Sequence, residues 1–454
     1  MTDAILIVGG GIAGLTAAQQ VSAAGAKAIV VERQPVVGGK LAAPMTRAKA
    51  IGNRAGGEEI PLFEALAEDD NICIVTNATL AALDGRVGNF TATVTERARF
   101  VTDDCTRCKK CHAVCPVVMP NEFDQGLTFR KAIYTPMITT LPEAWAIDVE
   151  NCLNTPPNYL PCNRCVEVCE DDAIRFDEPV ETTHEFHVGA VVLAPGMQIE
   201  SGNGYADLGF GVHPDVVTSA ELQRLLESPG PSGGFATRPS NEEYPESVLL
   251  VLDNPSPFGL YIVASQAKQL LEQDVRSVSV LVLSPPTASE AAAQLEQTAN
   301  ISVRWGAAMQ VAGDADGPID VSFEDLADNK LVRASYEMII LCVDVQPPAG
   351  IDKLADSAGV PLADSGYLET GEGNGAAVES GIPGVFVAGC GSGPKNIHDS
   401  IAGAKTAAAA AVSRLNPILL DGESEAMEAA ALPPQQDDAM RAQLEKLLQA
   451  LVDR

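Results

Sequence analysis

The chain is 454 residues long, 46% hydrophobic and rich in glycine, which is enough material for two or three packed domains without a metal site to hold the fold together. Its 61 acidic and 30 basic residues give a formal net charge of -31, which argues against nucleic acid or an anionic membrane surface as the main partner. No run reaches the roughly 18–20 consecutive apolar residues that span a bilayer, and the first strand follows without a basic leader. We therefore expect a cytoplasmic protein with no membrane span of its own.

The N-terminal segment carries a dinucleotide-binding pattern. Residues Ala4–Val8 form an apolar run of strand length, and an alanine-rich helix is expected to extend to about Ala24. Between them lies the sequence Gly9-Gly10-Gly11-Ile12-Ala13-Gly14. The first glycine of such a motif allows a tight turn, the second lets a pyrophosphate approach the backbone, and the third lets helix and strand pack closely. We expect Gly9, Gly11, Ile12, Ala13 and Gly14 to bind this part of a cofactor.

A second strand at Ala28–Val31 ends in Glu32, close to the distance of ~20 residues at which a carboxylate accepts the ribose hydroxyls. Arg33 follows, and then Gly38-Gly39-Lys40. An acid followed by a Gly-Gly turn resembles flavin domains more than nicotinamide domains. We therefore predict FAD, bound in part by Glu32, Arg33, Gly39 and Lys40. A plain NAD-binding domain is the alternative, because the glycine spacing does not distinguish the two cofactors.

Eight of the eleven cysteines lie in two runs between Cys105 and Cys169. The first run has the C-x2-C-x2-C-x3-C-P spacing of bacterial ferredoxins, in which the fourth cysteine binds the neighbouring cluster. The second run must then supply the exchanged ligand. We expect two [4Fe–4S] clusters, one bound by Cys105, Cys108, Cys111 and Cys169, and the other by Cys115, Cys152, Cys162 and Cys165.

Three alternatives to this assignment stay open. Each run could bind its own cluster, a single cluster could be present because Cys152 lies in a proline-rich loop, or the cysteines could bind zinc or form disulfides. Zinc is the poorer match, since zinc sites seldom use a third cysteine so soon after the second. Lys109, Lys110, Arg130 and Lys131 place positive charge near the cysteines, either to favour reduced clusters or as ordinary solvated surface. Cys73, outside both runs, is expected to be a core residue.

Behind the cysteines, the run Val188–Leu193 predicts a buried strand that ends in Ala194-Pro195-Gly196, beside the cofactor. A glycine-rich hinge is expected at 229–234. Strands at Ser247–Asp253 and Ser277–Leu283, with a helix at about Tyr261–Glu272 between them, indicate a second βαβ unit. Its first turn has prolines where a glycine loop would bind phosphate, so we expect no NAD(P)H there. A shifted loop that still binds phosphate is the alternative.

The last part of the chain returns to the first unit. A strand near Val385 meets a helix that begins at about Asp399, which would place backbone donors and a positive helix dipole beside the flavin. Gly389, Cys390, Lys395, Asn396 and Ile397 are the candidate contacts. Cys390 stands where related flavoproteins often carry an Asp, as a buried thiol or a reactive one. The tail carries an amphipathic pattern, which suits packing on its own chain or on a partner protein.

These motifs together resemble the HdrA family, the A component of heterodisulfide reductase and its relatives in sulfur metabolism. Further passages of resemblance are Arg130–Pro136, Ala146–Asp148, 230–240 and Gly389–Ile397. The resemblance implies an α/β fold of two dinucleotide-binding, thioredoxin-reductase-like domains with an inserted α+β ferredoxin-like domain. The expected parts are an FAD-binding domain at 1–100, 181–240 (with a linker) and 348–417, the ferredoxin-like insert at 101–180, a degenerate NAD(P)-type Rossmann domain at 241–347, and an acidic tail at 418–454.

The resemblance also implies a function. The expected protein passes electrons between FAD and [4Fe–4S] clusters inside a heterodisulfide reductase-like complex, whose other subunits are its partners and through which alone it would associate with a membrane. Compared with the long methanogen type, no second C-terminal ferredoxin module is expected, which puts electron bifurcation in doubt and favours the short sulfur-oxidising or quinone-interacting bacterial types. The alternatives are a self-sufficient NAD(P)H-dependent FAD and iron–sulfur reductase, and a non-catalytic scaffold that keeps FAD for structure. No residue is expected to act as a dedicated catalyst.

Overall fold

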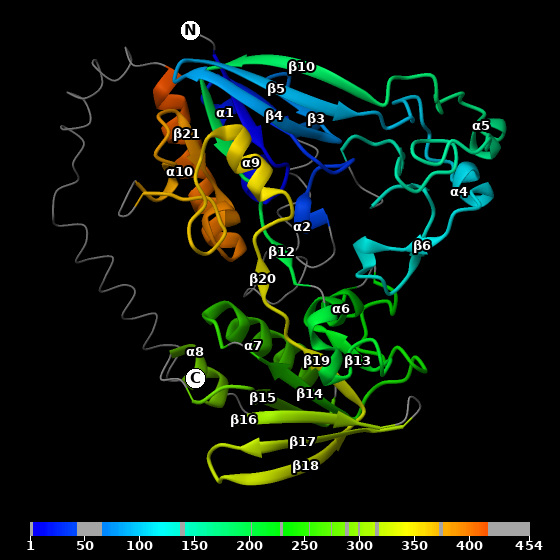
Figure 1. The fold of residues 1–454 in the computed structure, drawn as a ribbon, viewed down its shortest axis with the longest axis vertical. Coiled ribbons are helices and arrows are strands. Elements are labelled where there is room, and N and C mark those ends of the chain that lie inside the picture. Colours follow the sequence, from blue (N-terminus) through cyan, green and yellow to red (C-terminus); the bar gives the residue numbers. More distant parts are fainter. Residues whose placement is uncertain are drawn as a thin grey trace, which may run out of the picture.

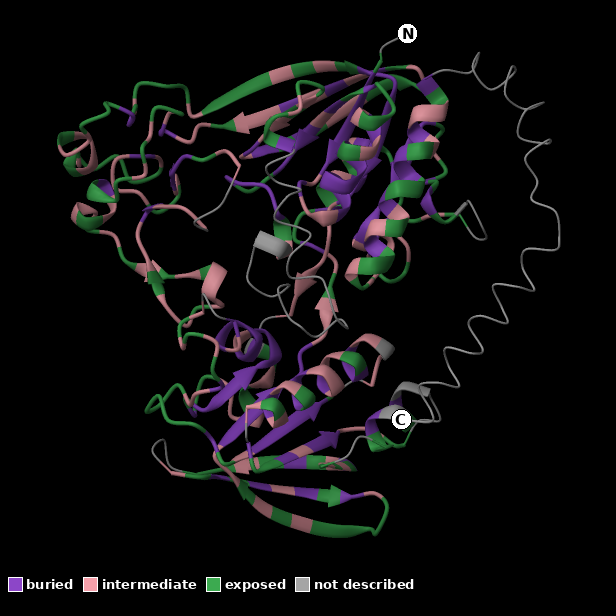
Figure 2. Cartoon of the chain, turned by 180° about the vertical axis from the view of Figure 1, so that it is seen from behind, coloured by how far each residue is buried: buried purple, intermediate pink, exposed green. Residues whose placement is uncertain are grey.

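The computed structural model describes residues 3–42, 66–136, 141–200, 202–227, 230–253, 255–273, 275–286, 290–297, 300–313, 317–371 and 376–415. Two sheets, each covered by helices, lie one above the other, and the cysteine-rich segment lies beside them (Figure 1). Buried residues concentrate in the central strands and in the helix faces turned toward them (Figure 2). The predicted amphipathic tail helix lies outside the described residues.

The first sheet has five parallel strands in the order β21-β11-β1-β2-β3. Their bounds are Val385–Val387, Ala190–Leu193, Ala4–Val8, Lys27–Val31 and Ile72–Val75. Strands β1 and β11 are buried along their whole length, as expected when both faces of a parallel sheet are covered. Segments from the beginning, middle and end of the chain thus form one sheet, in agreement with a dinucleotide-binding fold.

The two faces of this sheet have different covers. On one face, Ile5 and Ile7 pack with helices α1 (Ile12–Ala23) and α10 (Ile397–Leu415). On the other, Leu6 and Val8 pack with α9 (Ile351–Ala358) and with a three-stranded antiparallel sheet of β4 (Ala78–Arg86), β5 (Asn89–Arg97) and β10 (Glu181–Val188). The sheet is therefore closed on both sides, and its strand ends are left for ligands.

The expectation that Cys73 is a core residue is wrong. Cys73 lies in β3, which is the edge strand of the five-stranded sheet, and its side chain is exposed. The neighbouring Ile72 and Ile74 pack against the core instead. Because alternate residues of a strand point to opposite faces, Cys73 lies on the face opposite Ile72 and Ile74, and at the edge of the sheet its side chain stays exposed.

The second sheet has seven strands in the order β13-β19-β14-β15-β16-β17-β18. Their bounds are Val216–Thr218, Met338–Leu341, Ser247–Leu252, Ser277–Val282, Ile301–Ala312, Ile319–Asp325 and Lys330–Tyr336. The first five are parallel, and β17 and β18 extend the sheet as antiparallel strands. Helices α6 (Ser219–Leu225), α7 (Pro257–Glu272) and α8 (Glu290–Gln297) accompany it. The βαβ unit predicted from the sequence is present, and α7 begins earlier than expected.

Two chain crossings join the sheets. Strand β12 (Gln198–Ile199) leaves the first unit and pairs antiparallel with β20 (Val345–Gln346), which returns to it. Shorter elements near the carboxyl ends of the first sheet are α2 (Gly39–Ala42) and the 3-10 turn η5 (Gly389–Ser392). They belong to the segments that carry the candidate cofactor residues.

The cysteine-rich segment departs from β5 and returns in β10, which pairs with β5 along its length, from Arg97 opposite Glu181 to Phe90 opposite Val188. Both ends of the segment are therefore fixed at one place. It has little regular structure, mainly α4 (Lys110–Val114), α5 (Arg164–Glu167) and the short strands β6 (Met119–Pro120), β7 (Phe129–Arg130), β8 (Ile133–Tyr134) and β9 (Ala146–Ile147). A small apolar cluster that includes Phe100, Trp145 and Ile174 holds it together.

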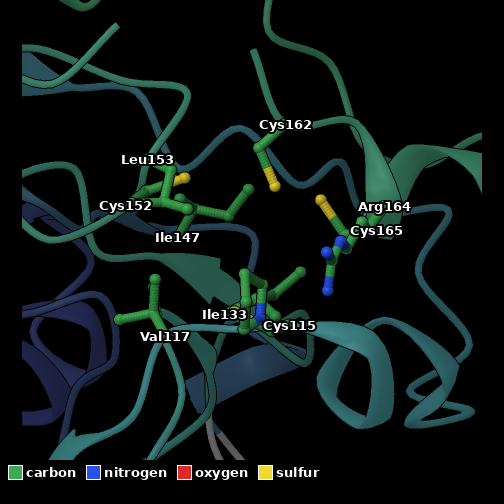
Figure 3. Close-up of a pocket in the computed structure, with 11 residues that line it drawn as sticks. Cys115, Val117, Ile133, Ile147, Cys152, Leu153, Cys162, Arg164 and Cys165 are labelled. Atoms are coloured by element: carbon green, nitrogen blue, oxygen red, sulfur yellow. The ribbon is translucent and has the colours of Figure 1, made fainter. Parts of the chain in front are cut away.

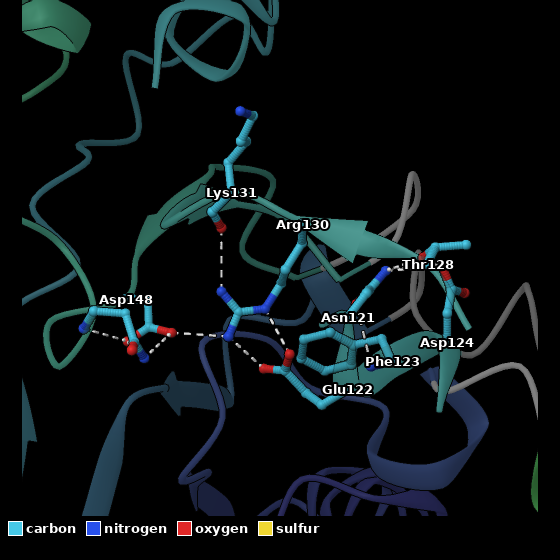
Figure 4. Close-up of polar contacts among 9 residues, drawn as sticks. Asn121, Glu122, Phe123, Asp124, Thr128, Arg130, Lys131 and Asp148 are labelled. Carbon is cyan, nitrogen blue, oxygen red and sulfur yellow. Dashed lines mark hydrogen bonds and ion pairs between the residues drawn. The ribbon is translucent and has the colours of Figure 1, made fainter. Parts of the chain in front are cut away.

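A hairpin of this segment also contacts the second unit. Arg224 of α6 binds Asp124 at 2.6 Å, and their side chains are only 7% and 16% exposed. Asn121 and Thr128 bind the same aspartate within the hairpin, and Leu127 packs against the second unit's core. Figure 4 shows Asn121, Asp124 and Thr128 near Arg130, which binds Glu122 at 2.5 Å and Asp148 at 2.8 Å. The segment is thus attached to both units.

A buried ion pair closes the second unit at β13. Asp215 is fully buried and accepts hydrogen bonds from the Arg238 guanidinium at 2.7 and 3.0 Å, and from the Ser240 N–H and hydroxyl at 2.9 and 2.8 Å. This bond set explains the resemblance passage at Arg238–Ser240: it holds the segment before β14 against the start of the sheet.

We predict that Asp215→Asn lowers the free energy of unfolding by about 3 kcal/mol, because it leaves the Arg238 charge largely buried without its partner. Urea unfolding followed by circular dichroism measures the change. The control is Glu246→Gln, which breaks the exposed pair with Arg276 and should cost at most about 1 kcal/mol. Equal effects of the two substitutions would contradict this role.

Candidate functional site

The glycine motif lies where β1 ends, beside the ends of β11 and β21. Gly9 has a φ of 110°, and a Cβ added there would lie 2.1 Å from the Ala194 carbonyl oxygen. A Cβ at Gly14 would lie 1.8 Å from the Gly9 carbonyl oxygen. Strand, turn and helix therefore pack in a way that only glycine permits at these two positions. Gly11, the N-cap of α1, differs, because a Cβ there would meet only the Gly39 Cα at 3.9 Å.

Glu32 lies at the end of β2 with 6% of its surface exposed. Its carboxylate accepts the Gly10 N–H at 2.6 Å and the Gln34 N–H at 2.8 Å. Burial raises the pKa of this carboxyl, and the two backbone N–H groups act in the opposite direction. Each carboxylate oxygen has a second lone pair, so the group can still accept a ribose hydroxyl.

The loop after Glu32 folds back over the glycine motif. The Gly38 N–H donates to the Gly10 carbonyl at 2.7 Å, and Gly39 lies against Gly11. The Arg33 guanidinium donates to the Ala349 carbonyl at 2.6 Å, which orients it toward the last part of the chain. Burial, followed by the nearby Arg33 charge, lowers the pKa of Lys40.

The third segment of the site is the turn between β21 and α10. Its first residues follow directly from β21, where the Ala388 N–H donates to the Leu193 carbonyl at 2.8 Å. The Cys390 thiol is half-buried and donates to the Lys395 carbonyl at 3.4 Å. The Lys395 ammonium donates to the Ser392 hydroxyl at 2.9 Å, and burial lowers its pKa. Asn396 accepts the Asp399 N–H at 2.8 Å and so caps the first turn of α10 next to Ile397.

These segments fit FAD. Gly9, Gly11 and Gly14 have no side chains that would block a pyrophosphate, and the Glu32 carboxylate can accept further hydrogen bonds. The residues Ala194-Pro195-Gly196 follow directly from β11 and lie beside Gly9. All converge on the carboxyl edge of a parallel sheet, where such folds bind ligands. That each of the sequence-selected residues contacts the cofactor stays a prediction.

The eight cysteines line two cavities. One is lined by Cys115, Cys152, Cys162 and Cys165, and Figure 3 shows the labelled side chains around it. The other is lined by Cys105, Cys108, Cys111 and Cys169. Each cavity therefore draws three cysteines from one run and one from the other, which is the exchanged arrangement. That these thiols bind iron stays a prediction.

The chemistry of both cavities fits a cluster. Apolar side chains form much of the remaining lining, together with Arg164 in one cavity and Arg107, Lys110 and Asp171 in the other. Ile133 lines both cavities, which makes them neighbours. Burial is the main factor that raises the pKa of the Cys111 thiol to about 11 and that of Cys165 to about 12. Within the described ranges, no three His, Cys, Asp or Glu side chains converge on the position of a single metal ion. A cubane cluster does not require such convergence, because each of its four cysteine ligands binds a different iron atom.

The basic residues near the cysteines are largely engaged with acids. Lys110 pairs with Glu170 at 2.5 Å, and Arg107 pairs with Glu143 at 3.0 Å. Arg130 is 10% exposed and bound by Glu122 and Asp148, and its guanidinium lies 4.2 Å from the centre of the Tyr134 ring. Arg130 therefore stabilises the fold of the segment, a role distinct from the surface charge or cluster tuning considered from sequence.

Arg99 links two parts of the candidate site in a way that the sequence did not reveal. It follows β5 and donates to the Pro35 carbonyl at 2.9 Å and to the Ala144 carbonyl at 2.7 Å. Nearby, the Val37 N–H donates to the Leu141 carbonyl at 2.9 Å. These bonds hold the cysteine-rich segment against the loop that follows Glu32. No local motif indicates this role, because the partners of Arg99 are distant in the sequence.

We predict that Gly11→Ala abolishes FAD binding while the chain still folds, because the added Cβ has space in the protein but occupies the approach of the pyrophosphate. The flavin content of the purified protein and its circular dichroism measure the two effects. The control is Gly403→Ala on α10, where a Cβ meets no atom within 4 Å and helix propensity favours alanine. Unchanged FAD binding in Gly11→Ala would contradict the assignment of the motif.

We also predict that cysteine variants lose EPR signals in the pairs that the cavities define. Cys115→Ser and Cys162→Ser should lose one cluster signal, and Cys108→Ser and Cys169→Ser the other. The control is Cys73→Ser, since Cys73 is exposed and lies outside both cavities. If Cys115→Ser instead lost the same signal as Cys108→Ser, each run would bind its own cluster.

Comparison with known proteins agrees with this geometry. Residues 4–151 match the model of the FAD dependent oxidoreductase family. The chain is 29% identical to the iron-sulfur A component of CoB–CoM heterodisulfide reductase from Methanocaldococcus jannaschii, over 89% of this chain and 63% of that protein. It is 30% identical to a protein of the same kind from Methanopyrus kandleri, over 91% of this chain and 65% of that protein. The chain thus spans slightly less than two thirds of the length of these relatives.

Solved structures that resemble the chain include two thioredoxin reductases. The protein from T. acidophilum has a TM-score of 0.48 and 15% identity, and the match covers 90% of this chain and 97% of that one. The protein from Lactococcus lactis has a TM-score of 0.48 and 14% identity, and the match covers 91% and 99%. The chain is therefore similar over most of its length to the A component of heterodisulfide reductase, and its first third is similar to FAD dependent oxidoreductases.

Proposed function

We propose that this protein is an electron-transfer component that carries FAD and two [4Fe–4S] clusters within a heterodisulfide reductase-like complex of sulfur metabolism. The observation that carries the proposal is the position of the two cysteine-lined cavities. They share Ile133, and their segment is held by Arg99 and Leu141 against the loop that follows Glu32. When bound, FAD supplies two-electron chemistry and each cluster transfers single electrons.

The residues of the chain would act by position and by exclusion of water. The eight cysteines would hold the clusters next to one another, and the apolar residues among the cavity linings, such as Ile133, would limit the access of solvent to them. Charge and exposure around a cluster set its reduction potential, so the paired acids and bases at the segment's surface would contribute to it. In this proposal the other subunits of the complex carry the substrate site.

We further propose that NAD(P)H does not reduce this protein directly. In the second unit, residues 255 and 257 are prolines and have no backbone N–H, and the Ser256 hydroxyl accepts the Gly259 N–H at 3.0 Å. The start of α7 therefore offers few donors to a phosphate, and no glycine precedes Gly259 in this turn to admit one. Electrons would instead arrive from a partner protein.

The proposed function also includes a cellular location. Among the described residues, no helix has the length and apolar composition that a membrane crossing requires. We propose a cytoplasmic location, with membrane association only through a partner. The relatives' names mention heterodisulfide, which supports a sulfur-metabolism context.

Anaerobic titration of the purified chain tests the function. We expect about eight irons and one FAD per chain, flavin bleaching by dithionite and no bleaching by NADH at catalytic rates. Cys165→Ser should retain FAD and lose about half of the iron, which separates the flavin signal from the cluster signal. Rapid bleaching by NADH would instead identify a self-sufficient reductase. A flavin that no donor reduces would identify a scaffold.

A further inference from the structure

Tyr367 is a buried tyrosine whose hydroxyl has no partner. The residue is 4% exposed, and its hydroxyl oxygen is inaccessible to solvent and makes no hydrogen bond in the part of the chain that the structure describes. Leaving a hydroxyl in this state costs free energy, so such groups in native proteins usually meet a ligand or an ordered water. Neither the glycine motif nor the cysteine runs involve this residue.

The surroundings of Tyr367 belong to the candidate flavin site. The next residue, Leu368, donates its N–H to the Gly391 carbonyl at 2.9 Å, within the turn that follows β21. The Leu368 side chain packs in the core below the sheet. Tyr367 follows the turn at Gly366, whose φ is 78°, and lies one residue before the contact of Leu368 with Gly391. Tyr367 is therefore close to the turn that carries Cys390, in the part of the fold where ligands bind.

The electrostatic surroundings keep the hydroxyl protonated. Burial is the main cause that raises the pKa of Tyr367 to about 12, and the charges of Cys390 and Asp344 act in the same direction. At neutral pH the group is therefore an uncharged donor. Cys390 itself follows Gly389 in the same turn, and its thiol is turned to the Lys395 carbonyl and the Ser400 hydroxyl. The Cys390 thiol already has partners within the protein, whereas the Tyr367 hydroxyl is available to donate a hydrogen bond to a ligand.

We propose that the Tyr367 hydroxyl donates a hydrogen bond to bound FAD and thereby favours its reduced form. The inference rests on the proposed FAD site. Reduced flavin carries negative charge, and a hydrogen bond to a charged acceptor is stronger than one to a neutral acceptor. Tyr367 thus contacts the cofactor and raises the affinity of the protein for reduced flavin relative to oxidised flavin.

The test is Tyr367→Phe in the full chain, which removes one oxygen and keeps the ring. We expect the affinity ratio for reduced over oxidised FAD to fall roughly tenfold, which corresponds to a midpoint potential lower by about 30 mV for a two-electron couple. Anaerobic spectroelectrochemistry measures the potential, and FAD titration of the apoprotein measures the affinity. The apoprotein of the variant should melt at the same temperature as the wild type or higher, because its unpartnered hydroxyl is gone.

The control is Tyr336→Phe, since Tyr336 ends β18 at the far edge of the second sheet (Figure 1). It should change neither the potential nor the affinity. Two results would overturn the role of Tyr367: an unchanged potential and FAD affinity in Tyr367→Phe, or a loss of apoprotein stability as large as that of the FAD-bound protein. A wild-type chain that binds no FAD would overturn the proposed function as well, so the two failures are distinguishable.

Discussion

The pairing of β5 with β10 is the constraint on which the rest of the arrangement depends. The chain departs for the cysteine-rich segment at the end of one strand and returns in the adjacent, hydrogen-bonded strand. A segment with so little regular structure cannot orient itself, yet it leaves and re-enters a well-packed sheet at one point. Arg99 lies at that point and binds the carbonyls of both the segment and the loop after Glu32. The position of the cysteines relative to the glycine motif is therefore a property of the first unit.

Much of the site could be predicted from the sequence because its signals are local. Each signal lies within a short stretch and corresponds to one part of an expected cofactor. The glycine motif corresponds to the pyrophosphate, the acid after the second strand to the ribose, and the two cysteine runs to the clusters. Strand β1 matches its expected bounds, Ala4–Val8. The ferredoxin spacing favoured the exchanged grouping of the cysteines and left open that each run binds its own cluster, whereas the structure groups the thiols in the exchanged way.

The remaining features depend on contacts between distant residues. Asp124 and Arg224 are separated by 100 positions, and neither belongs to a motif. Tyr367 carries no signal either, because its environment is created by a turn that follows β21. The exposure of Cys73 depends on strand order, which places β3 at the edge of the sheet, and strand order cannot be read from the residues around Cys73. The antiparallel strands β17 and β18 likewise extend a unit whose sequence indicated only its parallel part.

The ion pair between Asp124 and Arg224 gives the second unit a mechanical role. The two crossings at β12 and β20 alone would let the units turn about a narrow neck. A third connection, away from that neck, runs through the cysteine-rich segment, with a largely buried charge pair and the packed side chain of Leu127. Rotation of one unit relative to the other would expose both the charge pair and the Leu127 side chain to solvent. The second unit, whose first turn carries two prolines, would then serve as a rigid support, which keeps the distances between the proposed redox sites constant.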